Sequence, residues 1–271
     1  MAHHLFVVEG PHDAALLGKV AGELGFVQAE KQSELAATPF SVLIPRIYPA
    51  DKKGKLGHTV AHPDFYRRKA SAGDDWLILA VARGDTALVE KFATTLIELP
   101  KAFSSAVIIA DADLHPAANR FESVLAELVG EIARWNADGQ EGMPSILPTQ
   151  AGIPAIGDPV VAVYVWPDNN DPGNLEDLLL ACGAAQFAEL TNLGHQTVAA
   201  VGAMRPSATV DLKEFNKYRQ KATVGIVGSV LHPAASRAVV ISKGNWLPPP
   251  ETAPLSLTML RNFLLQIVGP A

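Results

Sequence analysis

The feature that most constrains the fold is a run of small and β-branched apolar residues, 106–110, that leads directly into Asp111 and Asp113. A short apolar run of this kind is typical of a strand buried on both faces of a parallel sheet. In open α/β sheets, ligands bind beyond the carboxyl ends of the strands. We therefore expect both aspartates to face a cleft. The alternative is that they only shape a turn and cap the next helix.

Two further apolar runs, residues 5–8 and 160–165, also lead into acidic residues. The acids that follow these two runs are Glu9, Asp13, Asp168, Glu176 and Asp177. If the three strands are parallel neighbours, their carboxyl ends bring all of these acids to one edge of the sheet. Two carboxylates about 4 Å apart repel each other by about 4 kcal/mol at an effective dielectric constant of about 20. Such a cluster needs protons or a cation to neutralise it.

A divalent ion, Mg²⁺ or Mn²⁺, is the expected cation, because oxygen ligands without a matching set of cysteines and histidines disfavour zinc. Gly10, directly after Glu9, lets the backbone turn sharply and lets a phosphate approach closely. The N-terminus of the helix that follows also suits an anion. Asp13 and Glu176 have an alternative role, since an acid in the first turn of a helix is favoured by the helix dipole alone.

Between these runs, apolar residues recur at helical spacing. Helices are expected at 13–24, 85–99, 119–135, 175–181, 183–193, 211–231 and 257–268. The run at 237–241 is compatible with strand or helix, and helix is the preferred interpretation. Further strands are expected at 41–47, 76–82 and 198–201. Strands that alternate with helices predict an α/β fold, a Rossmann-like and mostly parallel sheet with helices on both faces.

We expect a single domain over residues 1–271. Its core is placed at about 5–180, with a C-terminal helical extension at about 184–271. Two stretches without periodicity, about 48–75 and 136–159, are interpreted as loop insertions. The first of them carries clusters of Lys and Arg that are either solvated or in contact with nucleic acid.

The composition is that of a globular protein, with 48% apolar and 18% charged residues. No apolar run approaches the roughly 18 residues of a membrane span, and no signal peptide is evident, so a cytoplasmic location is expected. The net charge of −6 argues against a surface that coats nucleic acid, although a local basic patch is compatible with it. The single cysteine, Cys182, excludes an internal disulfide and a cysteine-rich zinc site.

Val-Glu-Gly-Pro-His-Asp at residues 8–13, followed by Ala-Asp-Ala-Asp at 110–113, resembles the Toprim domain. Toprim is the catalytic module of topoisomerases, bacterial primases, recombination-repair proteins and the overcoming-lysogenization-defect nucleases. Pro-Asp-Asn at 167–169 and Gly-Asn-Leu-Glu-Asp-Leu-Leu at 173–179 resemble stand-alone Toprim-like proteins related to those nucleases. The resemblance covers about 5–180, and the tail more loosely. It implies a Toprim core.

The resemblance also implies roles for individual residues. Glu9 would be a metal ligand or general base, while Asp111 and Asp113 would hold Mg²⁺ with help from Asp13. A second ion would be held by Glu176, with Asp168 and Asp177 as second-tier candidates. Two ions could activate a water molecule and stabilise the leaving oxygen of a phosphodiester. The nuclease relatives use a basic residue late in the fold; Lys221 is the candidate here, with Lys217 as the alternative, and a solvated lysine is the plainer interpretation.

The function expected from this resemblance is Mg²⁺-dependent phosphoryl transfer, most specifically a nuclease that hydrolyses DNA or RNA. No Walker A motif is present, so an ATPase of the relatives' kind would come from a partner chain. One alternative is a non-catalytic module that binds metal with a nucleotide or nucleic acid and acts with a partner. A minor alternative is a haloacid-dehalogenase-like phosphatase with Asp111 as nucleophile and Asp113 as general acid, although that family normally carries its Asp-x-Asp on the first strand.

Overall fold

The computed structural model describes residues 1–44, 63–71, 73–204, 215 and 218–270. Its centre is a six-stranded sheet in the order β2-β3-β4-β1-β5-β6. The strands are β1 (His3–Val8), β2 (Val27–Gln28), β3 (Asp64–Ala70), β4 (Gly73–Val81), β5 (Ser105–Asp111) and β6 (Val160–Trp166). The neighbours β4, β1, β5 and β6 are parallel, whereas β3 is antiparallel to both β4 and β2. The expected α/β fold with a mostly parallel sheet is confirmed.

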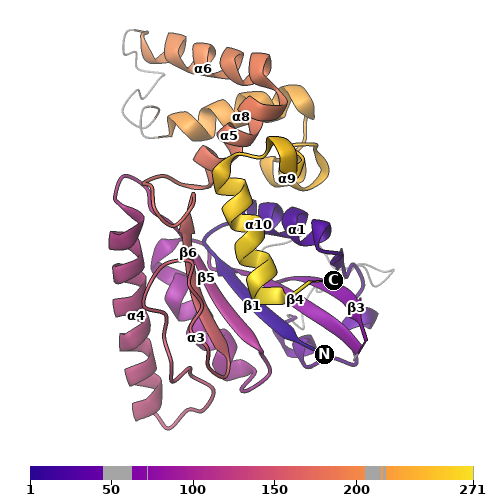
Figure 1. Cartoon of the computed structure of the whole chain (residues 1–271), viewed down its shortest axis with the longest axis vertical. Coiled ribbons are helices and arrows are strands. Elements are labelled where there is room, and N and C mark those ends of the chain that lie inside the picture. The colour runs from indigo at the N-terminus through magenta and orange to yellow at the C-terminus, as the bar shows by residue number, and fades with distance from the viewer. Residues whose placement is uncertain (45–62, 72, 205–214, 216–217, 271) are drawn as a thin grey trace.

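Helices cover both faces of the sheet (Figure 1). One face carries α3 (Leu88–Glu98) and α4 (Ala117–Ala137), and the other carries α1 (Pro11–Glu23), α5 (Leu175–Gln186) and α10 (Leu255–Val268). Successive strand residues point to opposite faces, so Leu5 and Val7 join one core while Phe6 and Val8 join the other. Burial on both sides explains why this strand is apolar throughout instead of alternating.

Beyond the carboxyl edge of the sheet, the chain forms a helical part (Figure 1). It contains α6 (Ala188–Gly202), α8 (Arg219–Leu231) and α9 (Arg237–Lys243). Helix α6 packs against α8, and α9 packs against α1. The remaining short elements are α2 (Gln32–Leu35) and the 3₁₀ turns Pro39–Leu43, Asp85–Ala87 and Pro250–Thr252.

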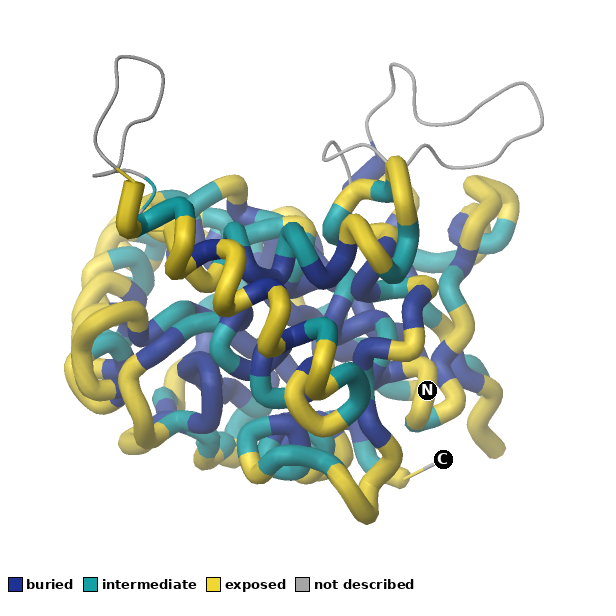
Figure 2. Tube along the Cα trace, turned by 90° about the horizontal axis from the view of Figure 1, so that it is seen from above, coloured by how far each residue is buried: buried dark blue, intermediate teal, exposed yellow. Residues whose placement is uncertain are grey.

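Buried residues run through the middle of the molecule, and exposed residues follow the outer sides of the helices (Figure 2). The C-terminal segment does not simply extend away from the core, because α10 packs against the sheet face covered by α1. Among the described residues, no helix has both the length and the apolar character that a membrane span requires.

The strand expected at 41–47 is wrong for residues 41–43. These residues belong to the 3₁₀ turn Pro39–Leu43, which Thr38 caps by accepting a hydrogen bond from the Phe40 backbone N–H (3.3 Å). Phe40 and Leu43, three residues apart, are buried on one side of that turn. This spacing is helical and does not match the alternation of a strand. Residues 45–47 lie outside the described part of the chain.

The loop expected at 48–75 is wrong for its second half, because β3 and the start of β4 form an antiparallel hairpin there. Phe65 is buried against the core, and Arg68 is buried as well. Arginine has an apolar stem that can be buried where its guanidinium finds partners, so a basic strand gives a misleading sequence pattern. Residues 48–62, with the first basic cluster, lie outside the described residues.

The short strand expected at 198–201 is also wrong, since these residues belong to α6. Val198 is buried there, and a short apolar run does not distinguish helix from strand by its period. Within the helix expected at 211–231, the described residue Phe215 is helical, Tyr218 lies in a turn, and α8 begins at Arg219. The helix at 237–241 is confirmed as α9, and residues 138–159 contain no helix or strand, as expected for the second loop insertion.

Candidate functional site

The carboxyl ends of β1, β5 and β6 lie side by side, as the sequence predicts. Just beyond them is a cavity of about 210 Å³. Six of its lining residues are candidates from the sequence: Glu9, Gly10, Asp13, Asp111, Glu176 and Lys221. His12, Gly84 and Leu175 complete its described lining. The acids that follow separate strands thus meet around one space.

Glu9 extends from the end of β1 and is held by two partners. Its Oε1 accepts a hydrogen bond from the backbone N–H of Asp111 (3.1 Å) and lies 3.5 Å from Nη2 of Arg120. Arg120, in the first turns of α4, also pairs with Asp85. Arg120 was not predicted from the sequence, because a residue on an amphipathic helix gives no sign that it faces a carboxylate so far away in the chain.

Asp13 and Asp111 hold the backbone around the cavity. Both oxygens of Asp13 accept hydrogen bonds, one from the Gly10 backbone N–H and one from Nε1 of Trp166, each at 2.9 Å. Oδ1 of Asp111 accepts a hydrogen bond from the backbone N–H of Leu175 (3.1 Å), which ties β5 to the start of α5. Asp13 is thereby accounted for as a helix-start residue that also fixes the turn after β1.

Glu176 and Lys221 line the same cavity and face each other. Glu176 is buried at the start of α5, and its Oε1 lies 4.0 Å from Nζ of Lys221 on α8. His12 on α1 lies in the same cavity, and burial, with Arg237 and Lys221 nearby, lowers the pKa of its imidazole to about 4. His12 was not among the candidates predicted from the sequence, although it lies within the Toprim-like motif at residues 8–13.

Burial and mutual repulsion disfavour the ionised form of the acids in this cluster. Burial raises the pKa of Glu9, Asp13 and Asp111. The negative charge of Glu9 adds to the rise for both aspartates. Burial likewise raises the pKa of Glu176, with Lys221 opposing the rise. Protons or a bound cation would relieve this repulsion.

Asp113 does not line the 210 Å³ cavity. It has a left-handed backbone (φ 55°), and its N–H donates to the carbonyl of Gly173 at 2.7 Å. An adjoining cavity of about 220 Å³ is lined by Asp113 together with Glu9, Asp85, Asp111 and Arg120. Asp113 therefore shares this adjoining cavity with Glu9 and Asp111, whereas Glu176 is not part of its described lining.

The remaining candidates have local structural partners. Oδ1 of Asp168 accepts hydrogen bonds from the backbone N–H groups of Asn170 and Asp171, which shapes the turn after β6. Asp177 forms a capping box with Asn174 at the start of α5. Lys217 lies outside the described residues. The structure thus brings Glu9, Asp111 and Glu176 together and leaves Asp168 in a turn.

A model of a protein family of unknown function, DUF3226, matches residues 3–262. The chain belongs to the DUF3226 family. Comparison with curated proteins and with solved structures gives no match. Every candidate residue described above lies within the segment that the DUF3226 model matches.

The fit of a metal ion to this DUF3226 protein is limited by hydrogen bonding. Within the described part of the chain, no group of three Asp, Glu, His or Cys side chains is placed to hold one ion. Asp13 already uses both oxygens, whereas the hydrogen bonds of Glu9 and Asp111 involve Oε1 and Oδ1 only. Mg²⁺ often binds through one or two carboxylates, with water and substrate phosphates as the other ligands. Glu9 and Asp111 fit an ion of that kind.

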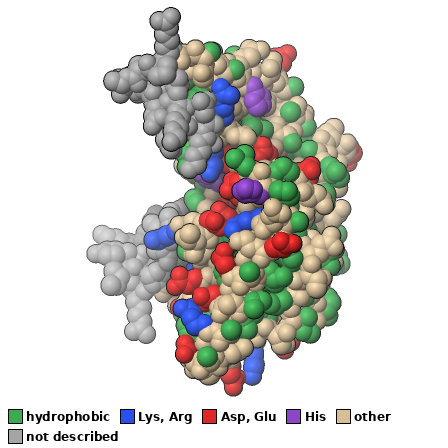
Figure 3. Space-filling model, turned by 90° about the vertical axis from the view of Figure 1, so that its left-hand side faces the viewer, with side chains coloured by type: hydrophobic (Ala, Val, Ile, Leu, Met, Phe, Trp, Pro, Cys, Tyr) green, Lys and Arg blue, Asp and Glu red, His purple; other side chains and the backbone are tan. Residues whose placement is uncertain are grey.

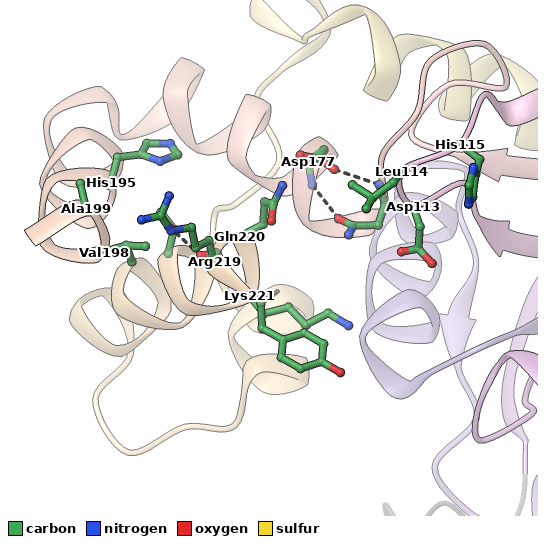
Figure 4. Close-up of a pocket in the computed structure, with 13 residues that line it drawn as sticks. Asp113, Leu114, His115, Asp177, His195, Val198, Ala199, Arg219, Gln220 and Lys221 are labelled. Atoms are coloured by element: carbon green, nitrogen blue, oxygen red, sulfur yellow. Dashed lines mark hydrogen bonds between the residues drawn. The ribbon is translucent and has the colours of Figure 1, made fainter. Parts of the chain in front are cut away.

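Acidic, basic and histidine side chains gather on the face of the molecule shown in Figure 3, between the sheet part and the helical part. Lys221 lines both the carboxylate cavity and a larger cavity beside it, which is drawn in Figure 4. The arrangement combines acids able to bind a hard cation with a lysine able to contact an anion. This combination suits a phosphate group held between the two.

Proposed function

We propose that this protein is a metal-dependent phosphoryl-transfer enzyme of Toprim type, and specifically a nuclease that hydrolyses phosphodiester bonds in DNA or RNA. The observation that carries the proposal is the meeting of Glu9, Asp111 and Glu176 around one cavity beside Lys221. Buried acids with raised pKa values, gathered in a cleft at the carboxyl edge of a sheet, are typical of functional sites.

In this proposal Glu9 and Asp111 hold one Mg²⁺ or Mn²⁺ ion, and Glu176, which lines the same cavity, is the candidate ligand for a second. When bound, the ion supplies charge stabilisation at a phosphoryl oxygen and lowers the pKa of a coordinated water. Lys221 binds a non-bridging phosphate oxygen. Asp13 acts indirectly, because its hydrogen bonds orient Gly10 and hold open the turn that the phosphate approaches.

The test is hydrolysis of single- and double-stranded DNA and RNA with Mg²⁺ or Mn²⁺, by the purified protein and by Asp111→Asn and Glu9→Gln. We expect cleavage that requires the metal and falls at least about 100-fold in each variant, because each loses a charged ligand. Asp138→Asn is the matched control, since Asp138 is exposed at the far end of α4. Equal cleavage by Asp111→Asn and Asp138→Asn would contradict the proposal.

A non-catalytic module that binds metal with nucleotide or nucleic acid is the second candidate. The observation that favours it is that Arg120 and Lys221 already pair with Glu9 and Glu176, while no described trio of ligands is ready for an ion. Calorimetry separates the two candidates. Divalent-ion binding that is lost in Asp111→Asn, without hydrolysis of any polymer, would support the module. Hydrolysis of a phosphomonoester such as p-nitrophenyl phosphate, without polymer cleavage, would instead support a phosphatase.

A further inference from the structure

A second cavity, with a volume of about 870 Å³, lies next to the carboxylate cavity and shares Lys221 with it. Its walls come from α6, from α8 with the preceding Tyr218, from the start of α5 and from the loop after β5 (Figure 4). A volume in this range is typical of sites that enclose a small molecule. The proposed nuclease chemistry does not use most of this space.

Lys221 connects the two cavities. Its Nζ lies 4.0 Å from Oε1 of Glu176 on the carboxylate side and 5.7 Å from the centre of the Tyr218 ring on the other side. If the phosphate of a ligand binds beside Lys221, the group attached to that phosphate can therefore contact the Tyr218 ring. The side chain of Lys221 is 42% exposed, so it is accessible from the cavity.

The lining of the large cavity changes in character away from Lys221. Val198 and Ala199 on α6 supply apolar surface, and the exposed Leu114 lies on the loop after β5. Arg219 and Gln220 add hydrogen-bond donors to the lining (Figure 4). Aromatic and apolar surface with a few polar groups is the usual environment of a bound nucleobase, whose faces stack and whose edges form hydrogen bonds.

The acids of this cavity do not exclude an anionic ligand from its centre. Asp177 is engaged in the capping box with Asn174, where its Oδ2 accepts the Asn174 backbone N–H at 2.9 Å. Asp113 lies on the side of the carboxylate cluster, opposite α6 in Figure 4. The basic side chains Arg219 and Lys221 stand on α8 between these acids and the apolar wall.

We infer that the 870 Å³ cavity binds the nucleoside of a nucleotide whose phosphate lies between Lys221 and the carboxylate cluster. The nucleotide is either free or an unpaired unit of a single strand. This inference rests on the proposed function and specifies its substrate class. A base enters such a cavity only when it is outside a paired stack, so a continuous duplex is excluded as the ligand of this site.

The probe is a single-stranded oligonucleotide with one 2-aminopurine, and binding is measured by its fluorescence with Asp111→Asn protein, which prevents cleavage. A matched oligonucleotide that is abasic at that position, carrying a distant dye, is measured by anisotropy. We expect the abasic probe to bind at least about tenfold more weakly, because base stacking is lost. Free 2-aminopurine nucleoside monophosphate, as a third probe, distinguishes a nucleotide site from a single-strand site. Equal binding of the abasic and base-bearing probes would overturn the inference.

Two neighbouring alanines on α6 provide a matched pair of variants. Ala199 lines the cavity and Ala200, also exposed, does not line it among the described residues. We expect Ala199→Glu to weaken binding of the 2-aminopurine probe at least about tenfold and Ala200→Glu to change it less than about twofold, although both add the same charge. Tyr218→Leu should weaken binding by roughly 5- to 100-fold, whereas Tyr218→Phe should retain it. Equal effects of the two alanine variants would overturn the inference.

The same α6 variants in protein with Asp111 intact separate this inference from the nuclease proposal. If Ala199→Glu leaves metal-dependent cleavage unchanged, the nuclease proposal stands and the cavity is not the site that binds the base. If Ala199→Glu abolishes base-dependent binding but the parent protein cleaves no polymer, the nucleotide site stands and the nuclease proposal is contradicted.

Discussion

At the scale of single residues, the carboxylate cluster places buried acids where their ionised forms repel each other. Asp111 accepts one backbone hydrogen bond, and burial with Asp13 and Glu9 nearby raises its pKa. A chain selected only for stability would not retain such a group, because removing it would relieve the repulsion. The cost of this arrangement is itself a sign of function.

We predict that Asp111→Asn stabilises the metal-free protein at alkaline pH. A carboxyl group whose folded-state pKa is raised favours folding while protonated, and this contribution declines as the pH rises from about 4 toward the raised pKa. Asparagine does not ionise, so the variant avoids that loss. Thermal unfolding in EDTA should show a gain of about 1–3 kcal/mol at pH 8 and a smaller gain at pH 5. A variant less stable than the parent at pH 8 would contradict this.

His4 gives the opposite pH dependence at a position remote from the cluster. It is 3% exposed, its Nδ1 contacts Oγ of Ser105 at 2.8 Å, and burial lowers its pKa to about 4. The stability that comes from the neutral ring is present above the unfolded-state pKa of about 6.5 and is lost as the pH falls through about 4. We expect a loss of up to about 3 kcal/mol in the parent, measured by urea unfolding, and a flatter profile in His4→Asn. Parallel profiles would show that His4 is not responsible.

At the scale of elements, one buried arginine joins the β3–β4 hairpin to the C-terminal helix. Arg68 donates to the carbonyls of Val268 (2.8 Å) and Gly269 (3.1 Å) at the end of α10. It also pairs with Asp75 on β4 at 3.2 Å and lies over the ring of Phe26. These contacts satisfy the last carbonyls of α10, which have no partners inside the helix.

We predict that Arg68→Met destabilises the protein by about 3–5 kcal/mol, because Asp75 loses its buried partner and the α10 carbonyls lose their donors. Arg68→Lys should recover only part of this, since an ammonium group lacks the planar fork. The adjacent control is Arg67→Met, where the ion pair with Glu34 lies near the surface and is worth at most about 1 kcal/mol. Similar urea-unfolding midpoints for Arg67→Met and Arg68→Met would refute the role of Arg68.

Elements also differed in how well sequence patterns predicted them. The apolar runs at 5–8, 106–110 and 160–165 became β1, β5 and β6, because burial on both faces leaves a continuous signal. The run at 198–201 became helix, because a run of four apolar residues is compatible with either period. Strand β3 gave no recognisable pattern, since its buried arginine depends on carbonyls at the far end of the chain.

At the scale of the whole molecule, metal binding should be linked to proton release. The acids around the cavity come from separate elements and carry raised pKa values, so an ion must displace protons to bind them. We predict that the affinity for Mn²⁺ or Mg²⁺ rises between pH 6 and pH 8. Calorimetry in buffers of different ionisation enthalpy measures the protons released. If the metal ion binds without proton release, or with an affinity independent of pH, the carboxylates are not its ligands.

The sequence alone predicted that β1, β5 and β6 are buried strands and that Glu9 and Asp111 meet at their carboxyl ends if these strands are parallel neighbours, which they are. The physical reason is local, since apolar runs define strands and parallel strands share an edge. Only the tertiary structure decided which other groups join them. Arg120 and His12 face the site, Asp168 closes a turn, and α6 with α8 encloses the second cavity. These placements depend on packing between residues far apart in the chain, and no local pattern specifies them.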